Sequence, residues 1–237
     1  RPEGVKVPLS LGQQRLLFLQ QLYPENPFYH YADAYKFKGK LSVKSLIKSF
    51  EIAAQRHHIL RTKVVFENGQ AFQQVNIKPL LEKTEHDLRG LPERELETVY
   101  KDLAIKEARK SLESPDGYVT RISVLRLKED EFLVVLTLHH IIMDKWSMQL
   151  LQNEVAGYYR KLSNGEEVNF SPLEIQYADY AQWQRQWLQG DELVRQFGLL
   201  HAQNTGSLKE MERFDFVVLS EVGSKDSEVN IAPYLWV

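Results

Sequence analysis

The residues best suited to chemistry are two adjacent histidines and an aspartate that follow an apolar run. The run extends from Phe132 to Leu138, the histidines are His139 and His140, and the aspartate is Asp144. An imidazole titrates near neutral pH and can accept or donate a proton, while a carboxylate can orient it or pair with a cation. The pattern therefore indicates acid–base chemistry at one end of a strand.

The apolar run predicts a strand that is buried on both faces. Because side chains alternate along a strand, His139 and His140 are expected to face opposite sides, one toward a cleft and the other behind it. After a turn, apolar residues recur every three or four positions from Ser147 onward, which predicts a helix. Asp144 or Ser147 can simply cap that helix, so a structural role for the aspartate stays open.

Hydrophobic spacing and turn residues predict alternating helices and strands along most of the chain. Helices are expected over residues 11–22, 43–56, 92–112, 147–163 and 177–188. Strands are expected over residues 28–37, 63–66, 71–77, 84–88, 119–127 and 132–138. Asn68-Gly69 predicts a tight hairpin turn between two of these strands. The fold class is α/β, a mixed sheet flanked by helices.

One predicted strand, residues 28–37, carries unusual side chains. Five of them share one side, namely Tyr29, Tyr31, Asp33, Tyr35 and Phe37. Such aromatic groups can line an acyl-binding surface, although packing across strands is their commoner use. On the last predicted helix, Tyr180, Ala181, Gln184 and Trp187 share a face that we expect to pack against the protein.

Composition excludes several classes of function. The 237 residues contain 30 Lys and Arg against 32 Asp and Glu, a net charge of −2, which gives no reason to expect nucleic acid or anionic membranes as partners. The chain has no cysteine, so disulfides, thiolate metal sites and a cysteine nucleophile are excluded. A cysteine-free chain without an apolar run of about 20 residues suits the cytoplasm. The first residue is Arg1 and not Met, so we expect the chain to be a piece of a longer polypeptide.

Four motifs, taken in order, resemble those of condensation domains from nonribosomal peptide synthetases, which are chloramphenicol acetyltransferase-like acyltransferases. The motifs are Leu9-Ser-Leu-Gly-Gln-Gln-Arg15-Leu-Leu-Phe18, Arg56-His-His-Ile-Leu-Arg61-Thr, His139-His140-Ile-Ile-Met-Asp144 and Tyr177-Ala-Asp-Tyr180-Ala-Gln-Trp183-Gln-Arg185. They are similar to the family's Leu-Ser-x-x-Gln-x-Arg-Leu-Trp-Phe, Arg-His-Glu-x-Leu-Arg-Thr, His-His-x-x-x-Asp-Gly and Tyr-Ala-Asp-Tyr-Ala-x-Trp-Gln. The resemblance covers residues from about 7 to 197.

The resemblance implies a division of the chain. Residues 1–8 are expected to be a linker and residues 9–176 the amino-terminal lobe of the acetyltransferase-like fold. Residues 177–197 are expected to lead as a helix toward a second lobe. Residues 198–237 match nothing and are too few for that lobe, so the chain is expected to be truncated; within them a strand is predicted over residues 214–219.

The resemblance also implies an activity, the transfer of a carrier-bound acyl or peptidyl thioester to the amine of a carrier-bound aminoacyl group. His140 maps onto the histidine at the reacting amine and His139 onto its support. Arg61 is expected to pair with Asp144, unless the two are unrelated solvated charges. The domain is expected to bind no cofactor or metal, because phosphopantetheine is carried by its partners. The partners implied are donor and acceptor peptidyl carrier domains and an adjacent adenylation domain.

Lys145 and the missing second lobe favour an alternative, a degenerate lobe that only docks carrier or partner domains. Lys145 replaces the glycine after the aspartate, which adds a side chain where positive φ or close approach is expected, and we expect it to lower or abolish activity. Separately, residues 114–118 stand where the family often has Pro-Phe-Asp-Leu, so that motif is degraded. A metal hydrolase using His57, His58, His139 and His140 is a third reading. The two doublets lack ligand spacing, and a pair at a helix end usually serves the helix dipole or solvent.

Overall fold

The computed structural model describes residues 4–22, 29–112, 119–189, 192, 195 and the backbone of 231–236. The helices are α1 (Leu11–Leu22), α2 (Val43–Arg56), α3 (Glu93–Arg109), α4 (Lys145–Ser163) and α5 (Tyr177–Trp187), with a 3-10 helix, η2, over His58–Arg61. The strands are β1 (Lys6–Pro8), β2 (His30–Lys38), β3 (Thr62–Glu67), β4 (Gln70–Val75), β5 (Leu81–Asp87), β6 (Thr120–Arg126), β7 (Glu131–His139) and β8 (Ile231–Trp236).

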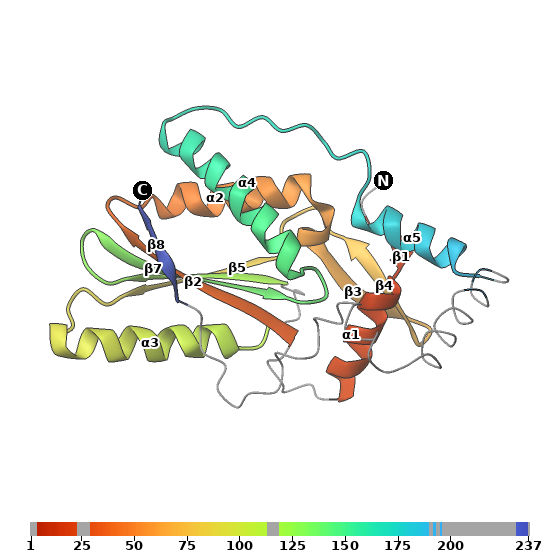
Figure 1. The fold of residues 1–237 in the computed structure, drawn as a ribbon, viewed down its shortest axis with the longest axis horizontal. Coiled ribbons are helices and arrows are strands. Elements are labelled where there is room, and N and C mark those ends of the chain that lie inside the picture. The colour runs from red at the N-terminus through yellow and green to blue at the C-terminus, as the bar shows by residue number, and fades with distance from the viewer. Residues whose placement is uncertain are drawn as a thin grey trace, which may run out of the picture.

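The main sheet has the strand order β5-β6-β7-β2-β8 and is mixed, as predicted. Strand β7 is antiparallel to β6 and β2, whereas β5 is parallel to β6 and β8 to β2. Helices α2 and α4 cover one face of the sheet, and α3 covers the other (Figure 1). The architecture is therefore a sheet between two helical layers.

Strand β7 lies at the centre of this core, and its residues 132–139 are all buried. Val134, Leu136 and Leu138 pack with the α2 and α4 layer, and Leu133 and Val135 pack with α3. The prediction of a strand buried on both faces is confirmed. Its physical cause is the unbroken apolar run, because an alternating strand would leave one face to water.

A second sheet of order β1-β4-β3 lies beside α1 and α5 (Figure 1). Its β3–β4 hairpin turns at Asn68 and Gly69, whose φ angles of 50° and 75° confirm the predicted tight turn. Residues 6–8, predicted as linker, instead form β1 and pair antiparallel with β4. Three residues are too few to show the alternation by which strands are recognised.

The aromatic side chains of α5 do not pack as predicted. Tyr180 and Trp187 are each 42% exposed, and Trp183 stacks on Trp187 with ring centroids 5.3 Å apart. The residues that α5 buries are Ala178 and Ala181. The helix therefore approaches the protein through its small residues, which allow close contact, and presents the rings of Tyr180, Trp183 and Trp187 outward.

The end of the chain adds a strand that the sequence did not predict. Residues 231–236 form β8, which pairs in parallel with β2 at the edge of the main sheet. The strand predicted over residues 214–219 lies outside the described residues, as does the segment 114–118 that departs from the family pattern.

An arginine inside the sheet ties α3 to the core. Arg121 on β6 is 0% exposed and donates to the carbonyl oxygens of Lys110 (2.7 Å) and Ser111 (2.6 Å), just past the end of α3. It also forms an ion pair of 2.6 Å with Glu82 on β5. The guanidinium thus satisfies carbonyl groups that a helix end leaves without partners.

We expect Arg121→Ala to lower the free energy of unfolding by about 3–5 kcal/mol, because it removes the buried cation that pairs with Glu82 and donates to the carbonyl oxygens of Lys110 and Ser111. Urea unfolding followed by circular dichroism measures this loss. The matched control is Lys101→Ala, which removes an exposed i,i+4 pair with Glu97 and should cost less than about 0.5 kcal/mol. Equal losses in the two variants would show that Arg121 does not anchor α3.

Candidate functional site

The two histidines stand where β7 ends, and their backbone is held from both sides. The amide of His139 donates to the carbonyl oxygen of Val119 (3.0 Å), next to β6, and that of His140 donates to Tyr29 (2.7 Å), next to β2. The chain then turns, and α4 begins at Lys145. Neighbouring strands therefore fix the position from which both imidazoles project.

His139 is a buried, neutral group that supports the turn. Its side chain lies beside the ring of His30 on β2, with centroids 5.9 Å apart. Nδ1 accepts a hydrogen bond from the amide of Ile141 (3.0 Å), so the proton of the neutral ring is on Nε2. Burial, followed by the nearby His30 and His140, lowers the pKa of His139 to about 3.

His140 lies on the opposite face of β7 from His139, as predicted. Its ring contacts Tyr31 edge-on, with centroids 6.1 Å apart, and Tyr31 and His30 are neighbours on β2 that face opposite sides. The ring is half-buried, and burial lowers its pKa, opposed by a hydrogen bond with the Met143 backbone and by the charge of Asp144. His140 is therefore neutral at pH 7 and able to accept a proton.

A third histidine belongs to this group and was missed by the sequence reasoning. His30 is paired with His139 in the β2–β7 register. Burial lowers its pKa to about 4, helped by the charges of Arg121 and His140, and its Nδ1 is buried without a partner among the described residues. Only the strand register could have revealed it, and a single sequence does not give that register.

The predicted pair between Arg61 and Asp144 is not formed among the described residues. Arg61 is buried on η2, and its guanidinium donates to the carbonyl oxygen of Asn76, beyond the end of β4. Asp144 is exposed, and its Oδ1 accepts from the amide of Ser147 (2.7 Å) as the N-cap of α4. The capping role that the sequence left open is the one the structure shows.

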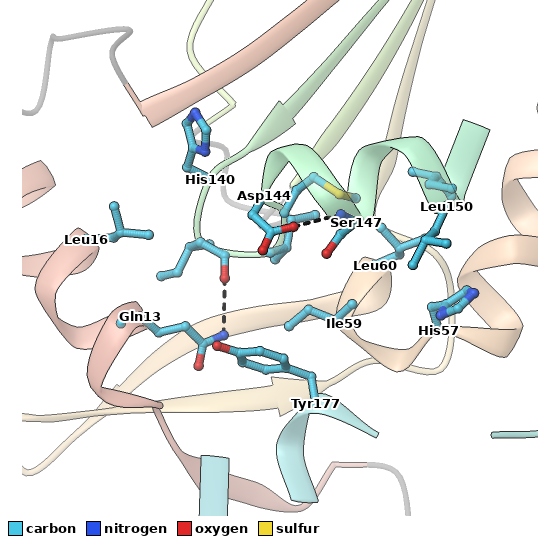
Figure 2. Close-up of a pocket in the computed structure, with 15 residues that line it drawn as sticks. Gln13, Leu16, His57, Ile59, Leu60, His140, Asp144, Ser147, Leu150 and Tyr177 are labelled. Carbon is cyan, nitrogen blue, oxygen red and sulfur yellow. Dashed lines mark hydrogen bonds between the residues drawn. The ribbon is translucent and has the colours of Figure 1, made fainter. Parts of the chain in front are cut away.

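A cavity of about 320 Å³ lies beside the turn, between α1, η2, the start of α4 and α5 (Figure 2). Gln13 of α1 reaches across it and donates from Nε2 to the carbonyl oxygen of Ile141 (3.2 Å). Tyr177 of α5 enters from another side and its hydroxyl lies 2.8 Å from Ser10 Oγ. His140 borders the cavity but points its ring away from Gln13 and Tyr177, as Figure 2 shows.

The first motif shows why α1 begins where it does. Ser10 Oγ accepts from the amide of Gln13 (3.1 Å), and Gln13 Oε1 accepts from the amide of Ser10 (3.0 Å). This reciprocal pair is a capping box, which satisfies two donors at a helix start. The same glutamine holds the turn after His140, so helix capping and site geometry depend on one side chain.

The His57-His58 pair connects the end of α2 to α4 and to the residue before α5, in addition to lying near the carboxyl end of the α2 dipole. Nε2 of His57 lies 2.8 Å from Glu154 Oε2 on α4, and Arg56 forms an ion pair with the same carboxylate. The amide of His58 donates to Gln176 Oε1 (3.0 Å), immediately before α5. The second motif therefore connects α2 to α4 and α5 around the cavity.

No group of three or more His, Cys, Asp or Glu side chains among the described residues is arranged to hold a metal ion. Within the same residues, no helix combines the length and apolar character needed to cross a membrane.

The low pKa of His139 predicts a pH dependence of stability. The unfolded chain binds a proton near pH 6.5 that the folded chain excludes down to about pH 3, so stability falls as the pH falls below 6.5. Between pH 7 and pH 5 this group should cost about 2 kcal/mol in the free energy of unfolding. His139→Gln, whose oxygen can still accept from Ile141, should remove that share in urea titrations. The same pH slope in both proteins would contradict the burial argument.

Comparison with known sequences gives a consistent result. The family model described as "Condensation domain" matches residues 4–197. The chain is 38% identical over 208 residues to one of the linear gramicidin synthase proteins of Brevibacillus parabrevis, an alignment that covers 87% of this chain and 3% of that protein. It is 32% identical over 194 residues to phosphinothricin tripeptide synthetase PhsC of Streptomyces viridochromogenes, which covers 81% of this chain and 18% of that protein.

Solved structures share the fold. A mutant of the starter condensation domain of the rhizomide synthetase RzmA superposes with a TM-score of 0.72 at 17% identity, covering 86% of this chain and 49% of that one. The X-domain in its complex with OxyB from teicoplanin biosynthesis gives 0.67 at 26% identity, covering 79% and 39%. The chain thus spans two fifths to one half of these solved chains and a small part of the curated relatives. With the family match extending over most of its length, the chain belongs to the condensation-domain family.

Proposed function

We propose that the chain supplies the histidine-bearing half of an amide-forming condensation domain of nonribosomal peptide synthesis. The reaction joins a carrier-bound acyl or peptidyl thioester to the amine of a carrier-bound aminoacyl group. The observation that carries the proposal is His140, a half-buried neutral imidazole held at the end of β7 beside a cavity. Family membership supplies the reaction class.

The chemistry needs only a base and positioned substrates. The amine nitrogen attacks the thioester carbonyl, the C–N bond forms, the C–S bond breaks, and the thiolate leaves. His140 takes the proton that the nitrogen loses and returns it to the departing sulfur. Asp144 favours the protonated ring through its charge, and His139 keeps the turn in place through its bond to Ile141. The acyl group arrives activated, so no serine or cysteine nucleophile is required.

The partners follow from the same proposal. A donor and an acceptor carrier domain would each present a phosphopantetheine arm, and an adenylation domain would lie nearby in the assembled synthetase. The arms belong to the carriers, so this domain binds no cofactor of its own. The cysteine-free composition suits a reducing compartment, and we place the reaction in the cytoplasm.

Replacing His140 by Ala should lower turnover by about 100-fold or more, because general-base catalysis supplies at least that factor. Residues 1–197 would be fused to the remaining half of a condensation domain from the related linear gramicidin synthase, and amide product on the acceptor carrier followed by mass spectrometry. The matched control is His86→Gln on β5, which should keep full turnover. An active H140A chimera would overturn the proposed role of His140. An unmodified chimera that folds and forms no amide would count against the proposed function itself.

Lys145→Gly in the same chimera should raise turnover severalfold. Lys145 is the exposed first residue of α4 and does not have the positive φ that the family's glycine suggested, so its side chain and charge are the expected hindrance. Lys145→Ala should therefore raise turnover equally. If neither variant raises turnover, Lys145 is not a cause of low activity. If only K145G raises turnover, the backbone conformation at this position is the cause, and not the lysine side chain.

A second candidate function is docking without catalysis. It is favoured by Lys145, and by the similarity to an X-domain that forms a complex with OxyB. Surface plasmon resonance with loaded carrier domains tests it directly. Carrier binding by the folded chimera without amide product would support docking, while turnover that depends on His140 would exclude it.

A further inference from the structure

A polar cluster lies next to His140 on the same side of the main sheet. Tyr31, Asp33 and Tyr35 occupy every second position of β2 and so share one of its faces. Gln152 of α4 faces them. Asp33 Oδ2 accepts from the hydroxyls of Tyr31 (2.9 Å) and Tyr35 (2.8 Å) and from Gln152 Nε2 (3.3 Å). Tyr31 is the residue whose ring contacts His140, so the cluster is continuous with the proposed catalytic base.

The other carboxylate oxygen of Asp33 is open. Oδ1 accepts no hydrogen bond from the described part of the chain and is absent from its buried unpartnered atoms. Burial and the hydrogen bond to Asp33 raise the pKa of Tyr31 to about 12 and also raise that of Tyr35, so both phenols remain donors. Three donors fix Oδ2 and orient Oδ1 as a ready acceptor for a further donor or cation.

A large apolar cavity adjoins this cluster. It measures about 540 Å³ and lies between the β2–β7 face of the sheet and helices α2 and α4. Tyr35 and Gln152 line one end, beside Asp33, and Phe37, Phe50, Leu136 and Val155 are among its apolar walls. Ligand sites in proteins usually have volumes of about 300–1,000 Å³, and this cavity falls within that range.

We propose that Asp33 is a specificity-determining residue that binds the ammonium group of an aminoacyl substrate whose apolar side chain occupies the adjoining cavity. This inference rests on the proposed condensation activity and assigns part of its substrate preference. Carrier-bound donor and acceptor aminoacyl groups share this chemistry, a primary ammonium beside an apolar side chain.

The charges around the cavity decide the polarity of the ligand. Arg160, the cation that lines the cavity, is eight residues beyond Gln152 on α4, which places it about 12 Å away along the helix. The Asp33 end is therefore the place for a positive group. A plain fatty acyl chain would fill the cavity but would offer no donor to Oδ1 of Asp33, so its binding gains nothing from the carboxylate.

The test uses the 237-residue chain and two probes with one side chain, leucinamide and 4-methylpentanamide, which lacks the amine. At pH 6.5 leucinamide is mostly protonated, since α-amino groups titrate near pH 7.7–8.0. Binding is followed by NMR chemical shifts of the Gln152 side-chain amide. We expect the Kd of leucinamide to be about tenfold lower than that of 4-methylpentanamide, as for a hydrogen bond to a charged group.

Asp33→Asn should equalise the two Kd values, and Asp130→Asn, an exposed control on the β6–β7 turn, should leave the tenfold ratio intact. Ala156→Trp places a large ring at an exposed position of the cavity wall and should weaken both probes. Equal binding of the probes to the unmodified chain, or an unchanged ratio in D33N, would overturn the proposal without touching the condensation activity, which is measured separately in the chimera.

The chimera also distinguishes the two sources of the ammonium. Asp33→Asn should raise KM about tenfold, with kcat little changed, for whichever leucyl carrier, donor or acceptor, binds at this site. An unchanged KM for both leucyl carriers would show that Asp33 selects neither.

Discussion

The antiparallel register of β2 against β7 is the constraint on which the site depends. It pairs nine consecutive residues, from His30 opposite His139 to Lys38 opposite Glu131. A slip of one residue would turn every side chain of β2 to the other face. His30 would then leave His139, and Tyr31 and Asp33 would leave the side of His140. The two faces of β2 enforce the register, because Tyr35 and Phe37 pack with the α2 and α4 layer, whereas Ala32 and Ala34 pack with the α3 layer.

The motifs that identify the family act through hydrogen bonds that meet around one turn. Gln13 holds the carbonyl of Ile141, Tyr177 holds Ser10, and His58 holds the residue before α5. These bonds link α1, η2, the turn after β7 and α5, which are far apart in the sequence. Each is short-range and directional, so a small shift of any one element moves the others. The motifs are thus structural supports for His140 more than separate chemical groups.

The sequence predicted the elements that local patterns encode, and missed what depends on distant pairing. The apolar run 132–138 and the Asn68-Gly69 turn carry their structure in their own residue types. The role of His30 depends on register, and the expected pair of Arg61 with Asp144 gave way to bonds with Asn76 and Ser147. The strand at residues 6–8 exists only because β4 offers an edge. None of these partners can be read from one sequence.

For the proposed role of His140 as a base, the electrostatics of the turn determine how readily the ring returns a proton. Burial disfavours a charged ring and lowers the pKa of His140. The hydrogen bond with the Met143 backbone and the charge of Asp144 oppose this effect, but Asp144 is exposed, so solvent weakens its field. The balance leaves His140 a weak base. Such a base accepts a proton while the amide bond forms and then loses it easily to the departing thiolate. The conjugate acid of a stronger base would give up the same proton more slowly.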